Sequence, residues 1–223
     1  MFRFDQSIQQ VIFVLASFVI AVTIHEFMHA YTAHKLGDDT AKRLGRITFN
    51  PVAHFDPLGF FGMVMIAMGF PFIGWGKPVP VQPGNFRGKW ARNRKEGMLV
   101  VAAAGPASNV VQALIVAIPI QYMVRNGVGN QELFDALYTF MRINILLAAF
   151  NMIPVPPLDG YKILTGILPD FWTPVLRPLE QYGFMILILF IFVGGRLGGG
   201  SLFGAMIGPV YDGLMRLTLV GLL

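Results

Sequence analysis

The feature that most constrains this chain is an apolar run that ends in an HExxH pentad. Residues 8–24 (IQQVIFVLASFVIAVTI) carry no charge, and the pentad HEFMH follows at 25–29. Such a run approaches the roughly 20 residues that a helix needs to cross a bilayer. Residues four apart share one helix face, so His25 and His29 can bind one divalent metal, with Glu26 beside them to accept a proton from water. The sequence therefore predicts a hydrolytic metal site inside a membrane helix.

The composition is that of a polytopic membrane protein. Of the 223 residues, 55% are hydrophobic and only 13% are charged. The absence of cysteine excludes disulfides, thiolate zinc sites and cysteine nucleophiles. No small-residue cleavage site precedes the pentad, so a signal peptide is not expected. The pI near 9.7 indicates basic cytoplasmic loops rather than a nucleic-acid partner.

We expect a single transmembrane domain over residues 1–223, built entirely from α-helices apart from one segment considered next. The core is expected at about 8–170, and C-terminal helices at about 171–223, divided by a Gly-rich break at 194–200. The prediction is five or six transmembrane helices. The expected spans are about 8–34, 98–124, 132–153 and 179–194, with 201–223 as a further span or an interfacial helix.

A shorter apolar segment, residues 58–75, is interrupted by glycines and Pro71 and is not expected to cross as a simple helix. We expect a small membrane-embedded β-sheet or a re-entrant segment there, between the first and second full spans. Ten of the seventeen basic residues lie between residues 35 and 96. A non-crossing segment leaves all ten on one side, which the positive-inside bias makes cytoplasmic. His25 would then lie roughly 15 Å below the cytoplasmic surface, so the active site is expected toward that side.

A catalytic zinc site usually has three protein ligands, so the pentad leaves one ligand to be found. His34 points away from the pair on the same helix, and Glu96 lies in a basic loop. The best remaining donor is Asp159, at the end of the stretch NMIPVPPLDG. Its three prolines must unwind the helix that emerges from the preceding span. An Asp at this place is also suited to capping the next helix.

Three motifs together resemble the site-2 protease family of intramembrane zinc metalloproteases. They are the pentad, AGPASN at 104–109 and NMIPVPPLDG at 151–160, and the resemblance covers about residues 20–165. NPVAHFDPLG at 50–59 is similar to a segment of compact family members that lack a PDZ domain. The resemblance implies one catalytic zinc and a small membrane-embedded sheet. The roles it implies are zinc binding by His25, His29 and Asp159, general-base catalysis by Glu26, and a place for Asn151 near the scissile carbonyl.

Three polar residues have both a functional and a structural interpretation. Asn151 could donate to a developing oxyanion, or it could cap its helix or bridge two helices. For His54 the resemblance implies a place near the active-site entrance, and the alternative is a loop histidine held by Asp56. Asn109 is typical of helix packing, although a site-facing role is open to it.

The expected activity is hydrolysis of peptide bonds within or near transmembrane segments of membrane proteins, as in regulated intramembrane proteolysis. The expected partners are a single-span substrate and the lipid bilayer of the cell membrane. The main alternative is a metal-ion transporter that uses the same HExxH site, but the other spans carry few of the polar residues that a transport path needs. A prenyl-protein protease and a non-catalytic adaptor are further alternatives. Against the prenyl-protein protease, this chain lacks the downstream Glu-based ligand motif of that family. Against the adaptor, the glutamate of the pentad, Glu26, is intact.

Overall fold

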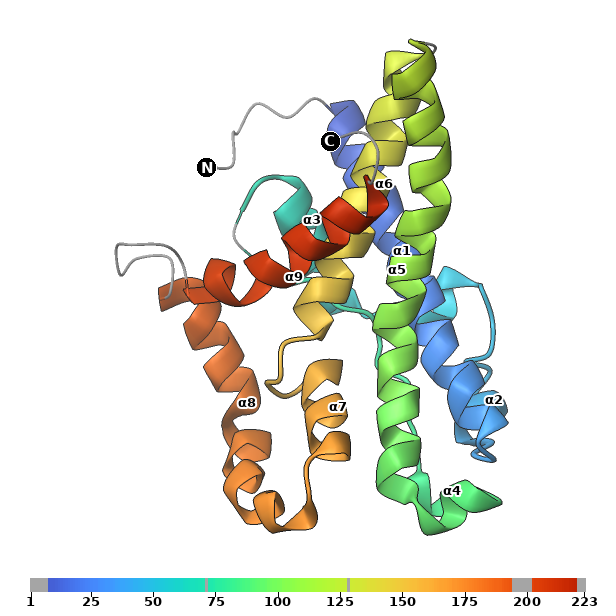
Figure 1. Ribbon diagram of the computed structural model, residues 1–223, viewed down its shortest axis with the longest axis vertical. Coiled ribbons are helices and arrows are strands. Elements are labelled where there is room, and N and C mark those ends of the chain that lie inside the picture. Colours follow the sequence, from blue (N-terminus) through green and yellow to red (C-terminus); the bar gives the residue numbers. More distant parts are fainter. Residues whose placement is uncertain (1–7, 71, 128, 194–201, 220–223) are drawn as a thin grey trace.

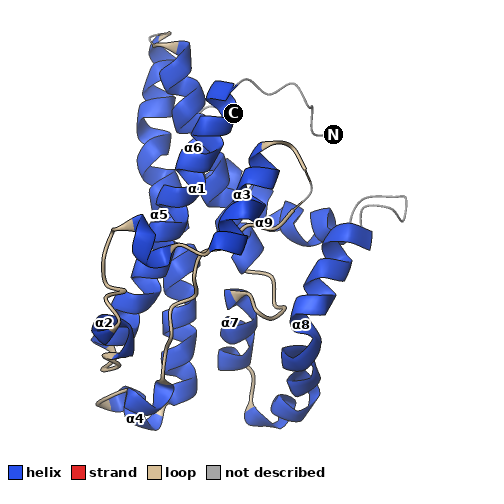
Figure 2. Ribbon diagram, turned by 180° about the vertical axis from the view of Figure 1, so that it is seen from behind, coloured by secondary structure: helices blue, strands red, loops and turns tan. Residues whose placement is uncertain are grey.

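The computed structural model describes residues 8–70, 72–127, 129–193 and 202–219, and every regular element within them is a helix (Figures 1 and 2). Three of these helices are long and apolar enough to cross a membrane: α1 (Ile8–Lys35), α5 (Arg94–Asn126) and α6 (Gln131–Asn151). They lie side by side in both views. The all-helical prediction is confirmed for the described residues, and these three helices form the frame of the site.

Apolar side chains join the three helices at two levels. Phe18 and Val22 of α1 pack with Ile143 and Leu147 of α6. Farther along, a second core joins α5 to α6 through Ala113, Ala117, Ile120, Met141 and Ile145. Alanines at this interface let the two backbones approach closely, which is how membrane helices commonly pack.

The prediction of five or six spans is not supported. Helices do occur in the two C-terminal regions, as α8 (Thr173–Val193) and α9 (Leu202–Thr218), but neither is among the membrane-length apolar helices of the described residues. Charged residues in the first half of α8 shorten its apolar part, and α9 has 17 residues interrupted by Pro209. In Figure 1, α9 runs obliquely between α8 and α6, and its Tyr211 and Leu214 pack on the α5–α6 core. The Gly-rich break at 194–200 lies outside the described residues.

The predicted β-sheet is also wrong for the described residues, since no strand occurs in them. In its place is the short helix α3 (Pro57–Ala67), capped by Asp56, whose Oδ1 accepts from the Gly59 N–H at 2.8 Å. The chain then returns along α3 without helical structure, as the tan stretch of Figure 2 shows. A Cβ at Gly59 would stand 2.0 Å from the Trp75 carbonyl oxygen, so only glycine permits this approach.

The two ends of the 55–76 segment meet. The Lys77 N–H donates to the His54 carbonyl at 2.9 Å, so the chain leaves and rejoins the bundle at one place. This agrees with the prediction that residues 58–75 do not cross as a simple helix. The short elements α2 (Thr40–Arg43) and α4 (Lys89–Arg92) lie together at the lower end of Figure 1, where α1 ends and α5 begins.

At the end of α1, a buried carboxylate joins three segments of the chain by hydrogen bonds. Asp38 follows α1 and is fully buried; it accepts from the Gln82 N–H at 2.6 Å, from Asn85 Nδ2 at 3.0 Å and from the Thr40 N–H at 3.0 Å. Burial opposes its ionisation, but these donors outweigh that effect and hold the pKa of Asp38 below its ordinary value. The stretch that returns from α3 is thereby fixed against the end of α1.

Candidate metal centre

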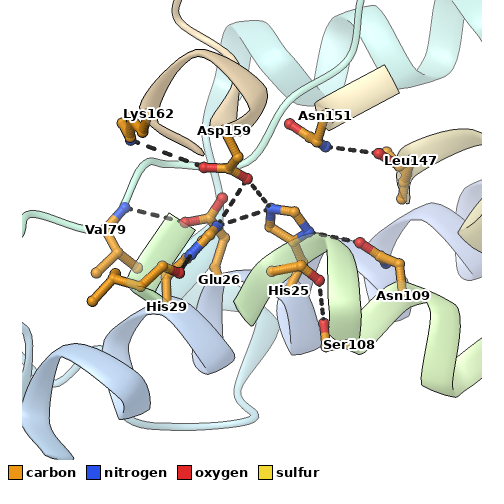
Figure 3. Close-up of polar contacts among 12 residues, drawn as sticks. His25, Glu26, His29, Val79, Ser108, Asn109, Leu147, Asn151, Asp159 and Lys162 are labelled. Carbon is orange, nitrogen blue, oxygen red and sulfur yellow. Dashed lines mark hydrogen bonds and ion pairs between the residues drawn. The ribbon is translucent and has the colours of Figure 1, made fainter. Parts of the chain in front are cut away.

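Two buried imidazoles of α1 and one buried carboxylate of α7 (Asp159–Ile167) converge on a single point (Figure 3). His25 Nε2 and His29 Nε2 each lie 3.1 Å from Asp159 Oδ2, and 3.0 Å from each other. Within the part of the chain that the structure describes, this is the one group of three acidic or histidine side chains so disposed. The structure thus brings together the three residues that the sequence predicts as ligands.

The unwinding of the chain after α6 brings Asp159 to this point. Prolines at 154, 156 and 157 cannot continue the helix, and short turns replace it, such as the bond from the Val155 N–H to the Ile153 carbonyl at 2.8 Å. The next helix begins at Asp159 itself, and Leu158 occupies the cap position. The carboxylate therefore faces the imidazoles instead of capping α7. A Cβ at Gly160 would lie 2.4 Å from the Met152 carbonyl oxygen, so glycine is needed for α7 to start here.

The AGPASN motif supplies the floor of the centre. A Cβ at Gly105 would stand 2.4 Å from His29 Nε2 and 2.6 Å from His25 Nε2. The absent side chain leaves α5 close to both ligating nitrogens while keeping their lone-pair side clear. Two neutral imidazoles and a carboxylate are a usual donor set for catalytic zinc, so the residues present fit this metal.

Each imidazole is held by its other nitrogen. The His25 Nδ1–H donates to Asn109 Oδ1 at 2.6 Å, and the His29 Nδ1–H donates to the Val101 carbonyl at 2.7 Å. This is the arrangement that fixes metal-binding histidines, because it leaves the Nε2 lone pair free for the ion. Of the two interpretations of Asn109, the structure places the residue in contact with the site.

Glu26 is half-buried beside the ligands and accepts from the Val79 backbone N–H at 3.1 Å (Figure 3). It lines the same cavity of about 340 Å³ as the three ligands. Asn151 lies on the cavity wall too, and its Nδ2 donates to the Leu147 carbonyl at 3.0 Å. One Asn151 amide hydrogen remains beyond that bond, so a donor on the wall is compatible with its position.

His54 does not line this cavity. It lies on a separate, smaller pocket, where its Nε2–H donates to the Thr48 carbonyl at 2.9 Å. Asp56 does not hold it, because that carboxylate caps α3. Burial, together with the nearby Arg46 guanidinium, lowers the pKa of His54. Its visible role is to support the returning chain, since its carbonyl accepts from Lys77.

Three residues of the site were missed by sequence reasoning. Val79 donates to Glu26 through its backbone N–H, and a backbone hydrogen bond leaves no signal in the sequence. Lys162 lies one turn after Asp159, with its Nζ 4.0 Å from Asp159 Oδ1, and this spacing could have indicated it. Asn144, bonded to Asn109, could have been noticed as an amide inside an apolar span.

A zinc-binding set with an adjacent glutamate, held by membrane-length helices, defines a membrane metallopeptidase as the class of protein. The model of peptidase family M50 matches residues 118–194. YwhC of Bacillus subtilis is 36% identical over 185 residues, covering 80% of each chain. MJ0611 of Methanocaldococcus jannaschii is 31% identical over 173 residues, covering 74% of each chain.

Rip2 of Mycolicibacterium smegmatis is 28% identical over 188 residues, which cover 81% of this chain and 66% of the relative. All three relatives are named as zinc metalloproteases. No solved structure gives a significant match. The chain belongs to peptidase family M50, the site-2 protease family, and is a zinc metalloprotease of the membrane.

Proposed function

We propose that this protein is an intramembrane protease that cleaves single-span membrane proteins within or near their transmembrane segments, as part of regulated intramembrane proteolysis. The observation that carries the proposal is the convergence of Asp159 with His25 and His29. Two of these residues lie on a membrane-length helix, so the centre lies at the depth of a substrate's own span.

The residues divide the chemistry between them. His25, His29 and Asp159 would hold one zinc ion, which when bound lowers the pKa of an attached water toward neutrality and polarises the peptide carbonyl. Glu26 accepts the proton of the attacking water and delivers it to the leaving amine. The Val79 N–H holds the Glu26 carboxylate in place for both transfers.

Asn151 is proposed as a donor to the oxyanion that develops on the scissile carbonyl, a contribution of about 3 kcal/mol in comparable sites. Its place on the cavity wall supports this role. A helical substrate hides its carbonyls, so the substrate must unwind before cleavage. The prolines of 77–81 and 154–157 keep these stretches out of helices, and both stretches border the cavity, so we propose that an extended peptide lies along them.

We further propose a multi-pass orientation in the cell membrane with the active site toward the cytoplasm. The meeting of Lys77 with His54 supports it, because a segment that returns to its starting point leaves the basic residues before and after it on one side. Those residues are Lys35, Lys42, Arg43 and Arg46 before the segment, and Lys77, Arg87, Lys89, Arg92, Arg94 and Lys95 after it.

The test is co-expression with a panel of tagged single-span membrane proteins, comparing the wild type with Glu26→Gln. Glu132→Gln is the matched control, because this exposed carboxylate in the first turn of α6 is remote from the cavity. Cleavage is expected with the wild type and the control, and not with Glu26→Gln. Cleavage by purified Glu26→Gln protein would contradict the assignment. Zinc flux into liposomes without peptidase activity would instead support a transporter.

A further inference from the structure

An unbroken series of hydrogen bonds runs from α6 through α5 to the metal-binding face of α1. Asn144 Nδ2 donates to the Phe140 carbonyl at 3.0 Å, and Asn109 Nδ2 donates to Asn144 Oδ1 at 2.9 Å. His25 Nδ1–H then donates to Asn109 Oδ1 at 2.6 Å. Both asparagines are 0% exposed, so no water competes for these groups.

The Phe140 carbonyl, at the α6 end of the series, fixes which group donates and which accepts in every bond. A backbone carbonyl can only accept, so Asn144 must turn its nitrogen to Phe140 and its oxygen to Asn109. That oxygen can also only accept, so Asn109 must turn its nitrogen toward it and its own oxygen toward His25. The Ala21 carbonyl, 3.4 Å from Asn109 Nδ2, favours the same orientation.

This orientation decides which nitrogen of His25 is free. With an oxygen facing Nδ1, the ring keeps its proton there, and Nε2 presents a lone pair toward Asp159. An Asn109 amide turned by 180° would face Nδ1 with its NH₂ group and move the proton to Nε2, which could then bind no metal. The tautomer of His29 does not depend on an amide side chain, because the Val101 backbone carbonyl accepts from its Nδ1–H directly.

We propose that Asn144 is a positioning residue for metal binding, acting through Asn109 to hold His25 in the Nδ1–H tautomer. The proposal rests on the proposed role of His25 as a ligand. Asn144 does not line the cavity, and its side-chain hydrogen bonds go to Asn109 and to the Phe140 carbonyl. Asn144 therefore affects the zinc affinity of the site through the tautomer of His25.

The experiment measures zinc affinity of the purified full chain by chelator competition, in a Glu26→Gln background so that proteolysis plays no part. Asn144→Leu keeps the branched shape of the side chain and removes both of its hydrogen bonds; zinc binding is expected to weaken about 10-fold. Asn144→Asp retains an oxygen toward Asn109 and, as a neutral carboxyl, a donor toward Phe140. It is expected to recover most of the affinity.

Gln112→Met is the matched control, because Gln112 is a buried amide of α5 three residues from Asn109, and neither polar atom of its side chain has a hydrogen-bond partner among the described residues. It is expected to leave zinc affinity unchanged. Wild-type affinity in Asn144→Leu, or an equal loss in Gln112→Met, would overturn the proposal. Failure of Asn144→Asp to restore binding would do the same.

A second measurement needs no change at Asn144. The chain has only four histidines, so ¹⁵N-histidine spectra of the zinc-loaded Glu26→Gln protein can be assigned. Zinc on Nε2 and a proton on Nδ1 are expected for His25; zinc on Nδ1 would overturn the proposal. His25→Ala separates the two levels of inference, because unchanged zinc affinity in that variant would refute the metal site itself.

Discussion

The backbone N–H of Val79 donates to Glu26 Oε2 across 3.1 Å, joining the returning chain after α3 to the glutamate of the pentad. The residues on both sides of Val79 are prolines, which lack an N–H. Val79 is therefore the one donor that the stretch 78–80 can offer. Glu26, the proposed general base, is held by a segment to which the sequence alone assigns no catalytic role.

We predict that Val79→Pro lowers kcat by about 10-fold or more, because it removes the N–H that orients the Glu26 carboxylate. Proline is compatible with the extended backbone here, since position 79 already precedes a proline. Val79→Ala keeps the N–H and is expected to retain activity. Equal rates for the two variants in a detergent cleavage assay would show that the hydrogen bond does not matter.

Gly105→Ala should abolish zinc binding while leaving the helices intact. The added methyl would stand 2.4 Å from His29 Nε2, where neither α5 nor the imidazoles can yield without separating the ligands. Metal content by mass spectrometry and helicity by circular dichroism are the measurements. Gly84→Ala is the control, since a Cβ there would meet no atom of the described residues within 4 Å. Full zinc occupancy in Gly105→Ala would contradict the described packing.

Asp159→Ala should lower zinc occupancy strongly, because it removes one of three protein ligands and leaves two buried imidazoles without their acidic partner. Asp170→Ala serves as the comparison, because Asp170 follows the end of α7 and its side chain is 91% exposed. Metal analysis after identical purification gives the result. Stoichiometric zinc in Asp159→Ala would require a different third ligand.

Asp38→Asn should lower the melting temperature by roughly 2–10 °C at neutral pH, because a fully buried acceptor of several hydrogen bonds loses its charge. The pKa of Asp38 is lowered in the folded state, so its contribution to stability is present above the unfolded value of about 3.9 and declines as the pH falls below it. Thermal unfolding in detergent at several pH values measures both effects. A difference between variant and wild type that does not shrink in acid would argue against the ionised carboxylate as the cause.

The sequence was sufficient to predict the three candidate ligands, His25, His29 and Asp159. The spacing of His25 and His29 follows from helix geometry, and the prolines before Asp159 must break a helix. Asp159 itself was predicted from the scarcity of other donors and from the resemblance of NMIPVPPLDG to the family motif, not from a local constraint. The non-crossing character of 58–75 was also predictable, from its length and from the charge around it.

The β-sheet and the span count depended on partners that the sequence does not name. Residues 77–81 have the prolines of an edge strand, but no strand occurs among the described residues to pair with them. Gly59 and Gly62 let residues 72–75 pack directly on α3. For α8 the prediction was wrong although the sequence held the reason, because Arg177 and Glu180 leave its apolar part shorter than a full span. Asn144 could be noticed in the sequence as an amide within an apolar span, but only the pairing of α5 with α6 reveals its link to His25.

The contact between Lys77 and His54 has a consequence for how relatives of this protein can diverge. Because the 55–76 segment is closed at its base, residues can be inserted or deleted at its far end without altering the path from α1 to the stretch that holds Glu26. Loops closed at the base tolerate changes of length at little cost in free energy. The length of this segment can therefore change while the metal centre stays as it is.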